Sequence, residues 1–170
     1  MKYLKIVFIN LLLLGLGSCD YRYGGEPYYD YNSQYTPVIM DRADLEQSIR
    51  IIGPREIKDY GKIYIKDSLL FINEKFEGIH VVDNSDPSNP ENLAFIVIPG
   101  NIDISILNDV IYADNAVDLI AIKYTGDSVR VIDRNRNIFP ELPAPEGQYY
   151  SYEGSANRPE NSVIVKWVLK

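Results

Sequence analysis

Short strand patterns that recur after about forty residues constrain this fold more than any other feature of the chain. Residues 62–98 hold four runs of Val, Ile, Leu and aromatic residues, separated by turns rich in Asp, Asn, Ser and Pro. The run at 110–114 repeats the run at 69–73, an offset of 41 residues, and the run at 119–123 repeats the run at 79–83. Four strands per period of about 40 residues are typical of a β-propeller blade, because such a small sheet must stack on a neighbour to bury a face.

We therefore predict an all-β fold, a partial β-propeller made of two four-stranded antiparallel blades at about residues 62–98 and 102–133. A short strand at Val38–Met40 precedes a short N-terminal helix, with Asp41 as its N-cap and Ser48 near its end. Ile49–Ile52 then returns to an extended pattern that Gly53-Pro54 stops.

The sequence divides into five segments: a signal peptide (1–18), a Tyr/Gly-rich tether (19–36), a propeller-like β domain (37–139), a Pro/Tyr-rich loop (140–161) and a terminal strand (162–170). The terminal strand places Val163, Val165, Trp167 and Leu169 on one face. We expect it to cover the open edge of a blade, since two stacked sheets leave unpaired backbone groups at their edges. The tyrosines of the tether form either an adhesive surface or a spacer, and we favour the spacer.

Cys19, the only cysteine, ends the sequence Leu16-Gly17-Ser18-Cys19, which follows Lys2, Lys5 and an apolar run. The run of twelve residues from Ile6 would be about 18 Å long as a helix, too short to cross a membrane but typical of a signal peptide. The order resembles a bacterial lipobox, so Cys19 is the predicted lipidation site. Lipid chains there would anchor the protein to a membrane.

Removal of residues 1–18 would leave 15 Lys and Arg (17 less Lys2 and Lys5) against 24 Asp and Glu, a net charge of −9. Such an acidic chain is not suited to nucleic acid. A lone cysteine also excludes an internal disulfide.

The segment from Gly78 to Pro90, which reads GIHVVDNSDPSNP, resembles the LVIVD repeat, a bacterial β-propeller repeat. In that motif a strand ending in Val-Asp enters a Ser-Asp-Pro-x-x-Pro turn. The wider stretch from Val38 to Ile122 looks like the LVIVD-repeat lipoproteins of Bacteroidota. The second unit departs from the motif at residues 123–127 (KYTGD), and propellers usually have about four to eight blades. The resemblance therefore implies a truncated propeller or a two-sheet remnant.

Residues with catalytic or metal-binding chemistry are few. His80, the only histidine, has no partner at a ligand or nucleophile spacing, so we interpret it as a hydrogen-bonded strand residue. Asp83–Asp86 lacks the order of an EF-hand loop, and turn chemistry explains it better than calcium. We interpret Asp103, Asp109, Asp114 and Asp118 as carboxylates of surface strands and turns, although a glycosidase pair is the alternative.

The sequence as a whole predicts a non-enzymatic cell-envelope lipoprotein, in the outer rather than the inner membrane. Its β domain would serve as a protein-interaction or ligand-binding module. The alternatives are a glycan- or nutrient-binding component and an inactive fragment of a longer propeller. We expect no catalytic residue, no metal and no cofactor, and partners limited to the membrane, through the lipid, and to a protein or glycan.

Overall fold

The computed structural model describes residues 34–145 and 158–170, and strands dominate them. The predicted signal peptide, Cys19 and most of the tether lie outside the described residues. The elements are β1 (Tyr35–Asp41), α2 (Arg42–Gln47), β2 (Arg50–Ile52), β3 (Tyr60–Lys66), β4 (Leu69–Glu74), β5 (Gly78–Asp83), β6 (Glu91–Val97), β7 (Ile104–Leu107), β8 (Val110–Asn115), β9 (Asp118–Tyr124), β10 (Val129–Asn135) and β11 (Ser162–Leu169). The all-β prediction is confirmed.

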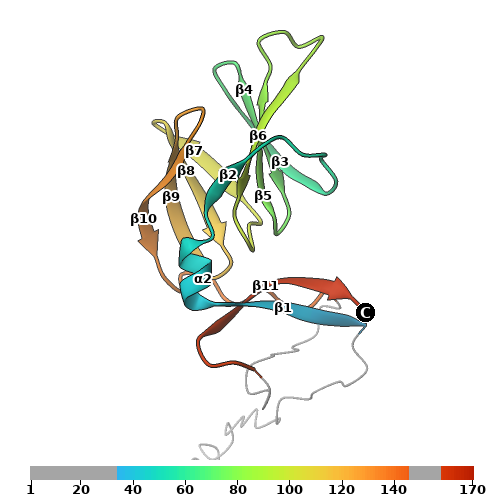
Figure 1. Ribbon diagram of the computed structural model, residues 1–170, viewed down its shortest axis with the longest axis vertical. Coiled ribbons are helices and arrows are strands. Elements are labelled where there is room, and N and C mark those ends of the chain that lie inside the picture. Colours follow the sequence, from blue (N-terminus) through green and yellow to red (C-terminus); the bar gives the residue numbers. More distant parts are fainter. Residues whose placement is uncertain (1–33, 146–157) are drawn as a thin grey trace, which may run out of the picture.

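These strands form three antiparallel sheets (Figure 1). The first sheet has five strands in the order β2-β6-β5-β4-β3, and the second has four in the order β10-β9-β8-β7. The prediction of a four-stranded first sheet is wrong by one strand. The segment Arg50–Ile52 pairs with β6, Ile51 opposite Ile96, because its extended apolar residues reach the otherwise open edge of that sheet.

Turn chemistry sets the strand boundaries as predicted. After β5, the Asp83 carboxylate accepts hydrogen bonds from the backbone N–H of Ser85 (2.8 Å) and from its hydroxyl (2.6 Å). The Asp86 carboxylate accepts from the Ser88 N–H (2.9 Å). These are the side-chain-to-backbone bonds by which Asp and Ser favour turns. They also lower the pKa of Asp83.

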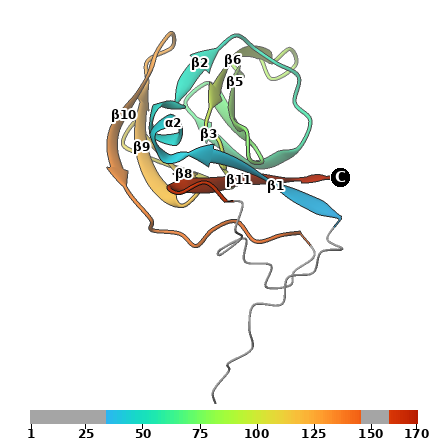
Figure 2. The ribbon, with the colours of Figure 1, turned by 60° about the horizontal axis from the view of Figure 1, so that its bottom comes forward.

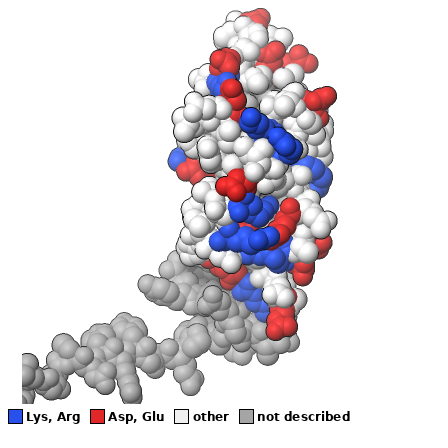
Figure 3. Space-filling model, turned by 90° about the vertical axis from the view of Figure 1, so that its left-hand side faces the viewer, with Lys and Arg blue, Asp and Glu red and all other residues white. Residues whose placement is uncertain are grey.

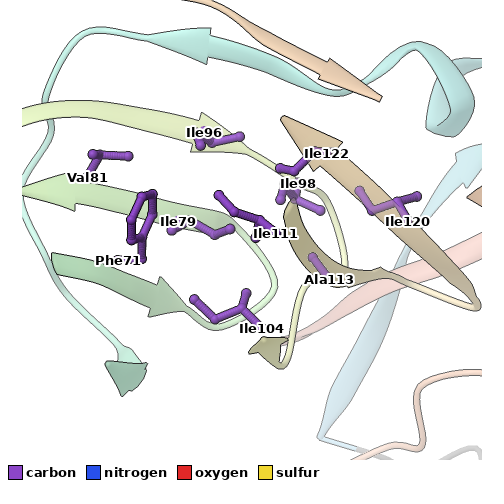
Figure 4. Packing of buried hydrophobic residues seen from close by; sticks show 10 residues of the cluster. All are labelled: Phe71, Ile79, Val81, Ile96, Ile98, Ile104, Ile111, Ala113, Ile120 and Ile122. Carbon is purple, nitrogen blue, oxygen red and sulfur yellow. The ribbon is translucent and has the colours of Figure 1, made fainter. Parts of the chain in front are cut away.

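The main core lies between the first and second sheets (Figure 4). Each sheet contributes alternate, inward-facing residues, as its pleat requires. The buried members are Phe71, Ile79, Val81 and Ile96 from the first sheet, Ile98 just after β6, and Ile104, Ile111, Ala113, Ile120 and Ile122 from the second sheet. β3 lies against β7 and β2 against β10, so the two sheets are stacked face to face.

The predicted recurrence is present in the strand register. Ile72 pairs with Ile63 and His80, and the residues 41 or 40 positions later, Ala113, Ile104 and Ile120, pair in the same way. We call such positions repeat-equivalent. The left-handed residues recur too: Asp67 (φ 54°) matches Asn108 (φ 48°), and Phe76 (φ 63°) matches Ala116 (φ 57°).

Repeat-equivalent residues point in the same direction along the stack. Phe71 faces the second sheet, whereas its equivalent Tyr112 faces away from the core. Ile104 faces the first sheet, whereas its equivalent Ile63 lies on the outer face. The sheets therefore stack head to tail, and each end of the stack presents the face that the core buries at the other sheet.

The third sheet is a ribbon of β1 and β11 that lies past the strand ends, on the side of the β8–β9 turn (Figure 2). The expectation that the terminal strand covers a blade edge is therefore wrong, because β11 pairs with β1, Ile39 opposite Ile164. The apolar side chains of β11 form a second hydrophobic cluster. Val163 and Val165 pack with Leu45 of α2 and with Ala116 and Val117 of the β8–β9 turn.

The short helix begins and ends as predicted. The Asp41 side chain accepts a hydrogen bond from the Ala43 N–H at 2.7 Å, as an N-cap does. Ser48 closes the last turn through the Leu45 carbonyl. Leu45 is the one buried residue of α2, and it attaches the ribbon to the end of the second sheet.

Candidate binding site

The outer face of the first sheet buries a polar group beneath the β2–β3 loop. His80 is fully buried, and its Nε2 is hydrogen-bonded to the Glu74 carboxylate, so the interpretation of His80 as a hydrogen-bonded strand residue is confirmed. Arg55 of the loop lies 4.4 Å above the Phe95 ring and 3.5 Å from Glu74 Oε1. The loop is further held by the Asn92 amide, which donates to the Arg55 carbonyl (2.8 Å).

On the same outer face, the apolar side chains of the edge strand β3 are exposed to solvent. Ile63 is 54% exposed and Ile65 is 73% exposed, although the repeat-equivalent residues Ile104 and Ile106 contribute to the core. β3 is also an edge strand, and Lys62 and Lys66 lie on it. Charged residues on an edge strand oppose pairing with another chain.

An aromatic pocket of about 270 Å³ lies at the β7 edge of the second sheet. It reaches from the outer face, on which Tyr112 lies, round β7 to Tyr64, which is on the inner face of the first sheet. Tyr64 of β3, Tyr112 of β8 and Phe139, which follows β10, surround it together with Leu119. Phe139 is held in place because its N–H donates to the Val117 carbonyl at 3.0 Å. The sequence reasoning missed this pocket. The signal that could have found it is the position of Tyr112, which is equivalent to the buried Phe71.

Polar groups line one side of the aromatic pocket: Asp103, Asp114 and the exposed Ser105. The Asp103 carboxylate accepts from Lys62 Nζ at 2.5 Å and from the Ile104 N–H at 2.8 Å. The Asp114 carboxylate accepts from the N–H groups of Ile102 and Asp103 and from the Asn101 amide. Burial raises the pKa of Asp114 above its ordinary value, because these hydrogen bonds only partly offset the lost hydration.

Asp118 is not a surface carboxylate, and that prediction is wrong. Its side chain is completely buried, and it accepts from Arg42 Nη1 (2.8 Å), Arg134 Nη1 (2.7 Å) and the Asn137 N–H (3.0 Å). A β-bulge near Ile132 shifts the register of β10, which brings Arg134 opposite Ile120 on the core side. Burial alone would raise the pKa of Asp118, but these hydrogen bonds together lower it below its usual value.

The bonds to Asp118 are part of a junction that joins α2 to the second sheet. Arg136 completes it with two bonds to Glu46, of 2.7 and 2.9 Å. On the side of β10, Lys and Arg gather with Asp and Glu among them (Figure 3). A larger, open depression of about 540 Å³ adjoins this junction, but Arg42 and Arg158 on its wall are already paired with Asp118 and Glu141.

The remaining predicted residues are dispersed. Asp109 lies in the β7–β8 turn and pairs with Lys66 at 2.5 Å, which lowers the pKa of Asp109. Trp167 donates from its Nε1 to the Leu142 carbonyl at 2.9 Å. Within residues 34–145 and 158–170, His, Cys, Asp and Glu side chains form no group of three that could hold a metal ion. In those residues no helix has the length and apolar character needed to cross a bilayer.

No protein-family model, no curated protein and no solved structure matches this chain. The resemblance to the LVIVD repeat therefore stays a prediction.

Proposed function

We propose that this chain is a non-enzymatic cell-envelope lipoprotein whose β domain is a propeller-like binding module. The observation that carries this proposal is the head-to-tail stacking of two sheets with one repeated register. A propeller is built from repeated antiparallel sheets, each of which stacks on its neighbour in the same orientation. The lipobox at Leu16–Cys19 and the LVIVD-like segment from Gly78 to Pro90 are the sequence support.

Covers on the two end faces support a module that folds with only two sheets. The loop between β2 and β3 covers Phe95 and His80 at one end, and the segment with Phe139 lies on the other. Repeat proteins need such caps, because an uncovered terminal face would expose apolar residues to water. These covers favour the binding module over the alternative of an inactive fragment.

The position of the first described residue suits attachment to a lipid. Gln34 lies beside the C-terminal residue, because the Lys170 N–H donates to the Gln34 carbonyl at 2.8 Å. Fifteen residues, 19–33, separate this point from the end of the predicted signal peptide. Fully extended they would span at most about 50 Å, so Gln34 would be held within that distance of the lipid.

Lipid attachment is tested by expressing the full chain in a bacterium of the Bacteroidota, with Cys19→Ser as the matched control. We expect mass spectrometry of the N-terminal peptide to show acylated Cys19 and no residues 1–18, and the protein to fractionate with the outer membrane. The Cys19→Ser variant should leave the membrane fraction or retain its signal peptide. An unmodified Cys19 in a chain that begins at Met1 would overturn the proposal.

A second candidate function, glycan binding, is favoured by one observation. The aromatic pocket combines three rings with carboxylate and hydroxyl groups, the mixture by which a small pocket fixes a polar ligand that has apolar faces.

A further inference from the structure

We propose that the aromatic pocket between Tyr64, Tyr112 and Phe139 binds one neutral sugar ring at the end or within the chain of a glycan. This inference rests on the proposed binding function and specifies its ligand. The pocket exists because the stack ends there. Tyr112 is equivalent to Phe71, which is only 3% exposed because the second sheet covers it. Among the described residues no further sheet covers Tyr112, which is 37% exposed.

The lining differs from the equivalent surface of the first sheet in a way that suits a polar ligand. Where the first sheet has Phe71, the second has Tyr112, which adds a hydroxyl to a flat apolar ring. A sheet packed on this face would bury that hydroxyl, whereas a hydrated ligand can bond to it.

The pocket has the size and chemistry for a single ring. Its volume of about 270 Å³ lies just below the range of drug-sized sites, which is roughly 300–1,000 Å³. Aromatic faces can cover the C–H face of a sugar, and the Asp103 carboxylate can accept hydrogen bonds from its hydroxyl groups. Hydrogen bonds to an ionised acceptor are about twice as strong as those between neutral groups.

Charge at the rim favours a neutral ligand over a cation. Aromatic rings beside carboxylates also attract ammonium groups. However, Lys62 Nζ lies 2.5 Å from Asp103 Oδ2 and would repel a second cation there. A sugar can use both partners, because its hydroxyl groups donate to the carboxylate and accept from the ammonium.

The test is isothermal titration calorimetry on the full-length protein, purified from membranes in a detergent without a sugar headgroup. The probes are maltohexaose, cellohexaose and mannohexaose, with choline chloride as the cationic probe. We expect at least one hexasaccharide to bind and choline not to bind. Tyr112→Ala and Phe139→Ala should weaken binding about tenfold, the effect of losing one aromatic contact. Tyr112→Phe should weaken binding less than Tyr112→Ala, because it removes the hydroxyl but keeps the ring.

The matched control is Tyr60→Ala, which removes the same side chain from β3 outside the pocket, where it is 68% exposed. Its affinity should equal that of the wild type. Three results would overturn the inference: no hexasaccharide binds, choline alone binds, or Tyr60→Ala weakens binding as much as Tyr112→Ala. The acylation of Cys19 is measured on the same preparation. An acylated protein that binds no sugar disproves only the pocket, whereas an unacylated one disproves the proposed function.

Discussion

The two stacked sheets share one strand register but differ at repeat-equivalent positions, because such a position faces the core in one sheet and faces away from it in the other. Ile120 of the second sheet packs in the core, and its equivalent in the first sheet is His80, bonded to Glu74 and lying beneath a loop. Ile104 is buried, and its equivalent Ile63 is exposed. A repeated sequence thus specifies a repeated strand register. Whether a position is apolar, polar or exposed depends on what packs against that face: the other sheet, a loop or solvent.

The β4–β5 and β8–β9 hairpin turns show the same contrast at one position. Gly78 adopts φ 144°, and a side chain there would overlap the carbonyl oxygen of Ile96. Its equivalent Asp118 is the carboxylate to which two arginines bind. The second turn can hold a side chain because β10 ends opposite Leu119, one residue before Asp118, whereas β6 continues to Val97 opposite Gly78. The turn thereby becomes the attachment point for α2.

Of the substitutions that test this difference between the two turns, Asp118→Ala should lower the free energy of unfolding most. It gives the second turn an uncharged residue, as in the first, but leaves Arg42 and Arg134 without their carboxylate. Removing one partner of a buried ion pair costs about 3–5 kcal/mol. Urea denaturation should show that loss in the free energy of unfolding, while the exposed control Asp127→Ala stays within about 0.5 kcal/mol of the wild type. Equal effects would mean that the junction contributes nothing to stability.

Substitutions at the repeat-equivalent residues Ile104 and Ile63 test whether the outer face of the first sheet is exposed to solvent. Ile104→Ala should lower the free energy of unfolding by about 2–4 kcal/mol, because it opens a cavity between the sheets. Ile63→Ala should cost less than about 1 kcal/mol, since its side chain is 54% exposed. Both are measured by the same denaturant titration at several protein concentrations. A comparable loss at Ile63 would show that something covers this face in solution.

The positions of the strands could be predicted from the sequence, but the pairing of the first and last strands could not. Alternation of Ile and Val, and turns such as Asp83–Asp86, locate β3 to β10 because both signals are local. The pairing of β2 with β6 and of β11 with β1 was not predictable, since each joins segments far apart in the chain. The length of the apolar run at Ile49–Ile52 carries no information about its partner.

The sites followed the same rule. The hydrogen-bonded state of His80 could be predicted, because a mid-strand histidine without ligand spacing has few alternatives. The burial of Asp118 could not be, since it depends on Arg42, which lies 76 residues away, and on a bulge that redirects Arg134. The aromatic pocket combines Tyr64, Tyr112 and Phe139 from three elements, so no local spacing indicates it.

His80→Ile would give the first sheet the residue that the second sheet has at the equivalent position. We expect the free energy of unfolding to fall by about 1–3 kcal/mol. The Glu74 carboxylate would still be paired with Arg55, but it would lose its hydrogen bond to the imidazole while remaining buried. Glu74→Gln in the same chain should recover part of this loss, because a neutral amide is less costly to bury. A double-mutant cycle in urea measures the coupling. Strictly additive effects would contradict a shared polar group at this position.

The smallest and sharpest test is Asp114→Asn, which replaces a carboxylate by the residue of its equivalent, Asn73. Burial raises the folded-state pKa of Asp114, so the protonated form favours the fold. Its contribution is complete below about pH 4, the unfolded pKa, and is lost as the pH rises through the folded pKa. The stability of the wild type relative to Asp114→Asn should therefore fall as the pH is raised above about 4.

Asp109→Asn is the matched control of opposite sign, because Lys66 lowers the pKa of Asp109 and its contribution is instead lost as the pH falls below about 4. Two carboxylates of one sheet with opposite pH slopes would show that burial beside the pocket, and not the net charge of the chain, determines the response.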